Sequence, residues 1–337
     1  DEVGADRFRF AHALVRSSLR SDLRSARRSR LHGRIAHALH DVFGDDVGHL
    51  QELAFHSAEA AAVDRTLRPI AVERLVRAAE ESIAQLSFEE AIDLLVRARS
   101  LAPSDDLHLS ADLALRLGMA QTRAGKNMTA ARTFEEAIEL ASDTDDIVLR
   151  VEAALRHEDA SWRPGLSGAT ALGHLTTAQR LLDEAIDADE EVPDELLLRA
   201  RLAVGRFRSL ALAGRRDEIH TAFEEARRLA AEIGAPNIEA NVLSVFIGHV
   251  MYYEDVDASA TMIERLAELE PLIDDKVVAL HALHDRILYA TLLGRFDDRR
   301  SMVKSMSERQ RRSHSSFWQF IRANQEAMEA FYEGDLE

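Results

Sequence analysis

The sequence predicts an all-α protein built as a superhelix of stacked helical hairpins. Short turns carrying Gly or an acidic residue recur at intervals of 40, 49, 40, 40 and 40 residues. They lie at Gly125, Gly165, Gly214, Glu254, Gly294 and Gly334. Each turn separates two amphipathic stretches. A fixed repeat of about 20–50 residues indicates an array in which each hairpin buries its apolar face only against its neighbours.

Composition agrees with this prediction. The chain has 337 residues, of which 46% are hydrophobic, with few Gly (15) and Pro (6) and 6% aromatics, a mixture that favours helices. The absence of cysteine excludes disulfides and thiolate metal sites. The longest apolar run, about 241–253, contains His249 and is shorter than the roughly 20 residues that span a bilayer. We therefore expect a cytoplasmic protein with no membrane contact.

The net charge of −17 is unevenly distributed. Residues 1–40 contain nine Arg and four acidic residues, a net charge of +5, so the remainder carries −22. An acidic array repels phosphate over a Debye length of about 8–10 Å, which argues against nonspecific nucleic-acid binding. We expect the N-terminal arginines to contact an upstream domain of the same protein.

Apolar periodicity predicts the individual helices. Helices are expected over residues 25–43 and 47–62, then in pairs over 70–86 with 88–101, 106–124 with 127–142, 145–162 with 171–187, 194–213 with 215–233, 237–253 with 257–270 and 275–293 with 295–312, ending with 316–332. A Gly/Pro/Ser insertion around 163–169 explains the 49-residue interval. Residues 334–337 have the composition of an inter-helix turn, so the array is expected to be truncated at its C-terminus.

Three hairpins carry a specific pattern of small and aromatic residues. The positions are Leu117-Gly118, Gly125, Ala130, Phe134 and Ala137; then Ala78-Ala79, Ala91, Leu95, Ala98 and Pro103; then Gly205, Phe223 and Ala226. This spacing resembles the tetratricopeptide repeat, over roughly residues 70–337, and the resemblance implies a right-handed superhelix. Later hairpins depart from the pattern, since Arg299, Val303 and Met306 fill the positions of Ala130, Phe134 and Ala137.

The N-terminal segment carries a second resemblance. The stretches FRFAHALVR at 8–16 and RRSRLH at 27–32 resemble the end of the winged-helix domain of STAND-type ATPases, such as the large ATP-binding LuxR-type transcriptional regulators of bacteria. The resemblance implies ATP or ADP in an upstream ATPase core, no cofactor in this fragment, and a contact from His12 to the nucleotide. Ala13 departs from the acidic residue common in relatives, and His12 as a plain helix-start residue is the alternative.

These resemblances predict three regions. Residues 1–45 are expected to be the end of a winged-helix domain, residues 46–68 a helical connector, and residues 69–337 the tetratricopeptide-like array.

No catalytic residues are predicted. Lys126 follows Gly125, but a phosphate loop needs an earlier Gly where Ala120 stands and a Ser or Thr where Asn127 stands. Ser167 lacks the spacing of a nucleophile elbow. No H-E-x-x-H occurs, and the pairs His37/His40 and His281/His284 lack a third ligand nearby in sequence, so no metal is expected. We expect no enzymatic activity in this chain.

The first helix of each hairpin is expected to line a concave binding groove. Its predicted lining is Arg123, Trp162, Arg163, Met251, Tyr252, His281, His284, Asn324 and Tyr332. Arg offers forked donors and aromatic rings offer rigid area for a peptide, a protein or a small anionic effector. The alternative for Trp162 and Tyr252 is a place in the core. The basic stretch Arg299–Arg312 is expected to form the outer face of its helix; DNA contact is the alternative.

The sequence thus favours a non-catalytic sensor arm of a multidomain bacterial transcriptional regulator. The resemblance implies that effector binding releases an upstream ATPase switch, permits self-association into a homo-oligomer, and engages DNA through a domain outside this chain. The alternative is a docking scaffold in a signalling enzyme, a cyclase or kinase, with the same architecture. A free-standing hydrolase is disfavoured because the sequence shows no nucleophile or metal constellation.

Overall fold

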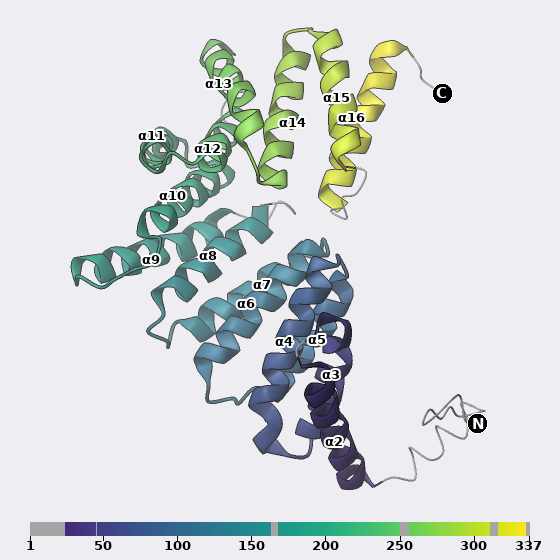
Figure 1. Ribbon diagram of the computed structural model, residues 1–337. Helices are drawn as coiled ribbons and strands as arrows, with labels where there is room; N and C mark the ends of the chain where they lie inside the picture. Colours follow the sequence, from purple (N-terminus) through teal and green to yellow (C-terminus); the bar gives the residue numbers. More distant parts are fainter. Residues whose placement is uncertain (1–23, 45, 163–167, 250–255, 311–315, 335–337) are drawn as a thin grey trace. The chain divides into compact units, whose positions relative to one another are not determined.

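The protein is all-α in the part that the structure describes. The computed structural model describes residues 24–44, 46–162, 168–249, 256–310 and 316–334, all of them in helices or the turns between helices. These residues form fifteen α-helices, α2 to α16, and three short 3-10 helices, Val47–His49, Arg65–Leu67 and Glu270–Leu272 (Figure 1). Successive helices pair as antiparallel hairpins, which confirms the predicted fold class.

The chain divides into two compact units, the first ending at Ala120 and the second beginning at Gln121. The helices of the first unit are α2 (Ser25–Phe43), α3 (Leu50–Ala61), α4 (Arg68–Ala84) and α5 (Phe88–Leu101), with most of α6 (Leu107–Arg123). Pro69 opens α4, where its missing N–H costs no hydrogen bond. Helices α2 to α5 pack in sequence, and α3 to α6 share one core around Leu75, Ala98 and Leu113.

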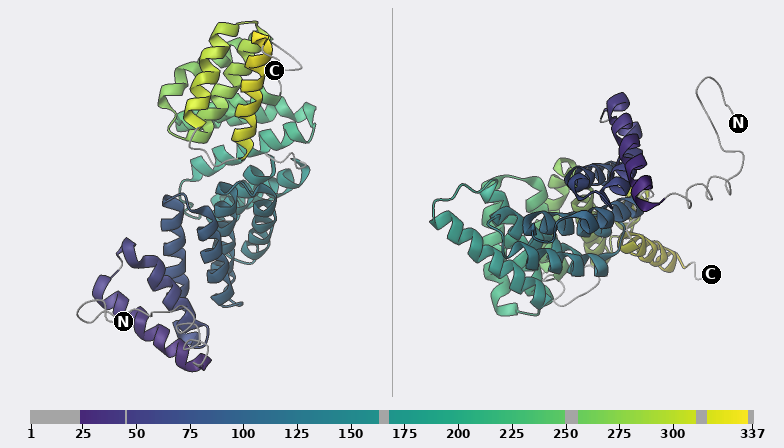
Figure 2. Two further views of the ribbon diagram at one scale, coloured as in Figure 1. Left: turned by 90° about the vertical axis from the view of Figure 1, so that its right-hand side faces the viewer. Right: turned by 90° about the horizontal axis from the view of Figure 1, so that it is seen from below.

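The second unit continues the same alternation. Its helices are α7 (Asn127–Ala141), α8 (Ile147–Trp162), α9 (Gly168–Asp187), α10 (Glu195–Leu212), α11 (Arg216–Ile233), α12 (Pro236–His249), α13 (Val256–Leu269), α14 (Lys276–Leu292), α15 (Phe296–Gln310) and α16 (Ser316–Glu333). Where both ends are described, the predicted and observed helix bounds differ by about three residues at most. The left-hand view of Figure 2 shows the last helices, in yellow-green to yellow, side by side, as the contacts of α15 with α14 and α16 require.

Among the described residues of the second unit, four apolar cores follow one another, and each is shared by three consecutive helices. They join α8, α9 and α10; α10, α11 and α12; α12, α13 and α14; and α14, α15 and α16. Helices α10, α12 and α14 each contribute to two cores. The helices therefore form a repeat array, because each hairpin completes its core with the first helix of the next hairpin.

The recurring turns end their helices in one conformation. Gly125, Gly214, Gly294 and Gly334 have φ between 67° and 77°, the left-handed region that glycine adopts without strain. In the first three, the N–H of the next residue donates to a carbonyl five residues back, as from Lys126 to Gln121 at 2.8 Å. Leu86 and Asp189 use the same arrangement with φ of 61°. The predicted turns at Gly165 and Glu254 lie outside the described residues.

The small and aromatic positions of the repeat pattern are buried, as the tetratricopeptide resemblance requires. Ala130, Phe134 and Ala137 are at most 1% exposed. In the degenerate hairpin their counterparts Arg299, Val303 and Met306 are also buried, Arg299 completely. The prediction that the basic stretch forms an outer face is therefore wrong for Arg299.

A network of polar partners makes the burial of Arg299 possible. Its Nε donates to Thr291 Oγ1 at 3.0 Å and its Nη2 to Gln325 Oε1 at 2.8 Å, and it forms an ion pair with Glu329. The ring of Tyr332 lies 5.2 Å from the guanidinium carbon. A cation takes the place of a small residue here because α16 supplies the acceptors.

The predicted region boundaries at residues 45 and 68 fall inside the first unit, and most of the segment compared with a winged helix lies outside the described residues. Among the helices that the structure describes, none is both long and apolar enough to cross a bilayer.

Candidate functional site

The first helices of the second unit's hairpins form a continuous row. Helix α8 contacts α10, α10 contacts α12, and α12 contacts α14. Their partners α9, α11, α13 and α15 each pack against the two helices that flank them in sequence. Side chains on the free face of α8, α10, α12 and α14 therefore share one wall, the wall on which the sequence places a binding groove.

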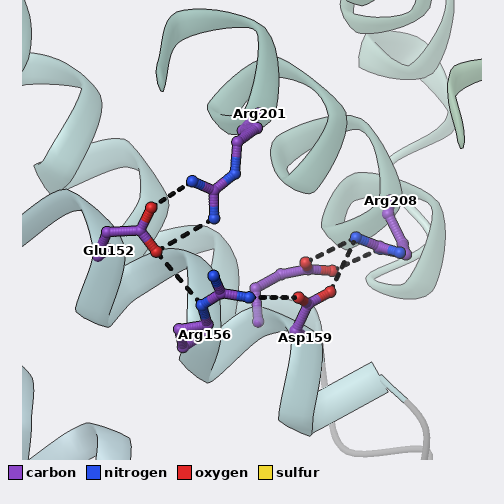
Figure 3. Close-up of polar contacts among 6 residues, drawn as sticks. Glu152, Arg156, Asp159, Arg201 and Arg208 are labelled. Carbon is purple, nitrogen blue, oxygen red and sulfur yellow. Dashed lines mark hydrogen bonds and ion pairs between the residues drawn. The ribbon is translucent and has the colours of Figure 1, made fainter. Parts of the chain in front are cut away.

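Charged side chains connect α8 to α10 along this wall (Figure 3). Glu152 on α8 pairs with Arg201 on α10, with Nη2 of Arg201 3.1 Å from Oε2, and with Arg156 on its own helix at 3.2 Å. Arg156 lies 3.9 Å from Asp159, which lies 3.6 Å from Arg208 on α10. Burial acts to raise the pKa of Glu152, but the hydrogen bond and charge of Arg201 outweigh it and hold that pKa below its usual value.

The network ends in a buried bidentate pair between Arg208 and Glu158. Arg208 donates from Nε to Oε1 at 2.7 Å and from Nη2 to Oε2 at 2.9 Å. Burial acts to lower the pKa of Arg208, and the charges of Glu158 and Asp159 reverse that effect, so the pKa is raised. Arg208 is a permanent cation held in one orientation by this fork.

Aromatic rings from three helices meet beside Arg208. The ring of Trp162, at the end of α8, lies 5.3 Å from the Arg208 guanidinium carbon. The ring of His281 on α14 lies 5.2 Å from that of Trp162 and 4.7 Å from that of Trp318 on α16. We call these four residues the Trp162 cluster. Trp162 and His281 are half-buried, whereas Trp318 is 2% exposed and packs against His281.

Polar groups of α12 and α14 extend the wall beyond the Trp162 cluster. Asp285 is 6% exposed, and its Oδ2 has no hydrogen-bond partner among the described residues. Burial raises the pKa of Asp285 to about 8, with the Ser244 hydroxyl acting in the opposite direction. Burial lowers the pKa of His284 to about 4. At neutral pH, Asp285 is therefore largely protonated and His284 is neutral.

This arrangement is suited to recognition. The two half-exposed rings of Trp162 and His281 offer rigid contact area, and the buried Arg208 guanidinium packs against the Trp162 ring. Such combinations of Trp, Arg and a neighbouring polar group are typical of the energetic centres of binding surfaces.

The structure brings some of the predicted groove residues together and separates others. The rings of Trp162 and His281 meet, and His284 is partly buried on the same helix as His281. Arg123 is exposed at the end of α6, and Asn324 is exposed on α16. Tyr332 packs on Phe296, with ring centroids 4.9 Å apart, about 21 Å along α16 from Trp318 by helical rise. His12, Arg163, Met251 and Tyr252 lie outside the described residues.

Sequence reasoning missed Arg208, Trp318 and Asp285. Each is buried on its helix, and Arg208 and Asp285 are two among many arginines and acidic residues of the chain. The available signal was positional, because Arg208 follows Gly205 by one turn and so faces α8.

The sequence matches no protein-family model, and no curated protein matches it. Solved structures do match. A Rap protein complexed with competence and sporulation factor has a TM-score of 0.50 at 12% identity, over 92% of this chain and 80% of that one. Aspartyl phosphate phosphatase F from Bacillus subtilis has a TM-score of 0.54 at 9% identity, over 90% and 75%.

A third similar structure is a STAND protein with a tetratricopeptide repeat sensor from Pyrococcus horikoshii. Its TM-score is 0.52 at 13% identity, over 97% of this chain but only 53% of that protein. At such identities these likenesses establish the fold, a tetratricopeptide-like helical repeat.

Proposed function

We propose that this chain is a non-catalytic interaction arm that binds a peptide or protein segment on the wall of α8, α10, α12 and α14. The observation that carries the proposal is the Trp162 cluster, in which four helices contribute one cation and three rings to a single place. Helix packing does not require an arginine and two half-exposed rings to meet at one place. Arginine and aromatic side chains gathered in this way are typical of surfaces that bind a partner.

The charge of the second unit indicates the chemistry of the partner. Residues 121–337 contain 26 basic and 40 acidic residues, a net charge of −14. Long-range attraction therefore favours a basic segment, and the Trp162 and His281 rings favour one with an apolar or aromatic anchor. The Rap protein noted above was solved with a bound factor, which supports a binding role for this architecture.

We further propose that the arm belongs to a bacterial regulator in which partner binding is read by an upstream ATPase. Support comes from the N-terminal resemblance and from the STAND protein whose repeat sensor shares this fold. Moving such a switch from mostly closed to mostly open requires the ligand to prefer the open state by about 5 kcal/mol. A binding surface with several anchoring residues can supply that difference.

Selection from a random peptide library displayed against the folded chain tests the binding role. We expect the selected peptides to be basic with an aromatic anchor. Trp162→Ala should weaken the affinity of the protein for these peptides at least about tenfold. The matched control is Phe320→Ala, which removes a ring 67% exposed on α16, two residues from Trp318. Selected peptides that bind Trp162→Ala and the wild type equally would place the binding surface elsewhere.

The regulatory role has a separate test in the full-length open reading frame. A helix-turn-helix domain after residue 337 favours the transcriptional regulator, and a cyclase or kinase domain at either end favours the docking scaffold. If neither is found together with an ATPase core, the regulatory proposal fails and the binding proposal stands on its own test.

A further inference from the structure

Three potential metal ligands converge from three consecutive helices of the second unit. They are Glu135 on α7, His157 on α8 and His174 on α9. One donor atom from each lies within 4.8 Å of the other two. His157 Nε2 is 3.5 Å from Glu135 Oε1, and the two imidazole centroids are 4.9 Å apart.

These separations are close to those that a metal ion needs. Zinc bonds of about 2.0–2.1 Å in a tetrahedron place neighbouring donor atoms about 3.3 Å apart. The Glu135–His157 pair already has nearly this spacing. The remaining closure of at most about 1.5 Å falls to Glu135, whose side chain is 47% exposed, and to half-buried His174, and both have room to move.

His157 is the buried member of these three residues. His157 is 3% exposed, and its Nδ1 has no hydrogen-bond partner among the described residues. The Ser161 Oγ, also buried, lies 3.5 Å from His157 Nε2.

We propose that Glu135, His157 and His174 form a site for one divalent transition-metal ion of the zinc class. Two imidazoles and one carboxylate are a ligand set that zinc, cobalt and nickel accept, with a fourth position open to water on the exposed side of Glu135. The ion ties α7, α8 and α9 together and leaves the Trp162 cluster, which begins five residues after His157, unobstructed.

The sequence predicts no metal site because it places no set of three ligands close together in the chain. Here the ligands are separated by whole helices, and only the packing of α7 on α8 and of α8 on α9 brings them together. The proposal is independent of the binding function above, since it concerns different residues and a different ligand.

Titration of the tag-free protein with Co²⁺ and Zn²⁺ tests the site. We expect one ion per chain, a visible absorption band of low-coordinate Co²⁺ that Zn²⁺ abolishes, and a rise in the thermal unfolding midpoint with Zn²⁺. Glu135→Gln keeps the shape of the side chain, and His174→Gln removes the ring nitrogens at a position outside the buried core. Each should weaken binding at least about tenfold.

The control is His37→Ala. It removes an exposed histidine that lies 3.5 Å from Asp41 in the first unit, and it should leave Co²⁺ binding unchanged. Circular dichroism confirms that each variant is folded. Failure of the wild type to bind either ion stoichiometrically, or equal binding by the wild type, Glu135→Gln and His174→Gln, would overturn the proposal.

Discussion

The guanidinium of Arg208 holds the carboxylate of Glu158 through two hydrogen bonds of 2.7 and 2.9 Å, with both side chains less than 9% exposed. This pair joins α8 to α10 and faces the Trp162 ring with its remaining surface. A buried ion pair of this kind adds little net stability, but it becomes costly when one partner is lost. Its role here is to fix one cation beside the aromatic rings.

Replacement of Glu158 by Ala is expected to lower the free energy of unfolding by about 3–5 kcal/mol, because Arg208 stays buried without its main counterion. Urea denaturation followed by circular dichroism measures the loss. Arg180→Ala, which breaks an exposed pair with Glu184 at 58% exposure on both sides, should cost at most about 0.5 kcal/mol. Equal losses in the two variants would contradict the structural role of the buried pair.

Asp285 makes stability depend on pH. Its pKa is raised from 3.8 to about 8 in the folded protein, so the folded state binds more protons than the unfolded state between these values. The free energy of unfolding contributed by Asp285 therefore falls as pH rises from about 4 to 8. Asp285→Asn is expected to remove this fall and to stabilise the protein at pH 9, by at most about 6 kcal/mol.

His284 acts in the opposite direction. Its pKa is lowered from 6.5 to about 4, so stability is lost as pH falls through that window. Urea midpoints of wild type and Asp285→Asn between pH 5 and 9 separate the two groups. The variant should gain most at the alkaline end, and an advantage that stays constant with pH would show that Asp285 is not the titrating group.

The backbone at Leu86 is strained in a way that glycine would avoid. Leu86 has φ of 61° and 56% exposure, in the same helix-ending arrangement that Gly125, Gly214 and Gly294 adopt. A residue with a Cβ carries roughly 1–2 kcal/mol of strain in this region. Leu86→Gly is expected to raise the free energy of unfolding by about 1 kcal/mol.

The reverse change at Gly214 is the matched control. No atom lies within 4 Å of a Cβ built on Gly214, so Gly214→Ala should destabilise through backbone strain alone, by about 1 kcal/mol. Denaturation midpoints that move in the same direction for both variants would contradict this reading.

The array could be predicted from sequence because its determinants are local and repeated. Apolar periodicity and turn glycines fix each helix, and the 40-residue interval fixes the hairpin. Leu86 escaped notice because its conformation is set by the helices on either side and not by its own preference. Arg299 was misplaced because its burial depends on acceptors in α16, which no local pattern connects to α15.

The candidate site was predictable only in part, for the same reason. Trp162 and His281 could be assigned to first helices from the repeat register. Their meeting depends on how far each hairpin turns relative to the last, and sequence spacing does not encode that angle. Trp318 and Arg208 therefore became visible as partners only in the folded second unit.

Close packing of α9 on α10 depends on Gly168. A Cβ built there would lie 2.4 Å from the Ser209 carbonyl oxygen and 3.0 Å from the Ala213 nitrogen, both of them backbone atoms that cannot move alone. Gly168→Ala is therefore expected to destabilise the protein by about 1–3 kcal/mol, because the two helices must separate. Gly173 lies on the same helix with nothing within 4 Å of its built Cβ, so Gly173→Ala should stabilise by up to about 1 kcal/mol through helix propensity. Urea denaturation of both variants compares their free energies of unfolding.

Gly168→Ala should also disturb the Trp162 cluster, because Ser209 adjoins Arg208 in the chain. We expect a shift in tryptophan fluorescence emission that Gly173→Ala does not produce. An unchanged emission spectrum would show that the packing of α9 does not affect the Trp162 cluster.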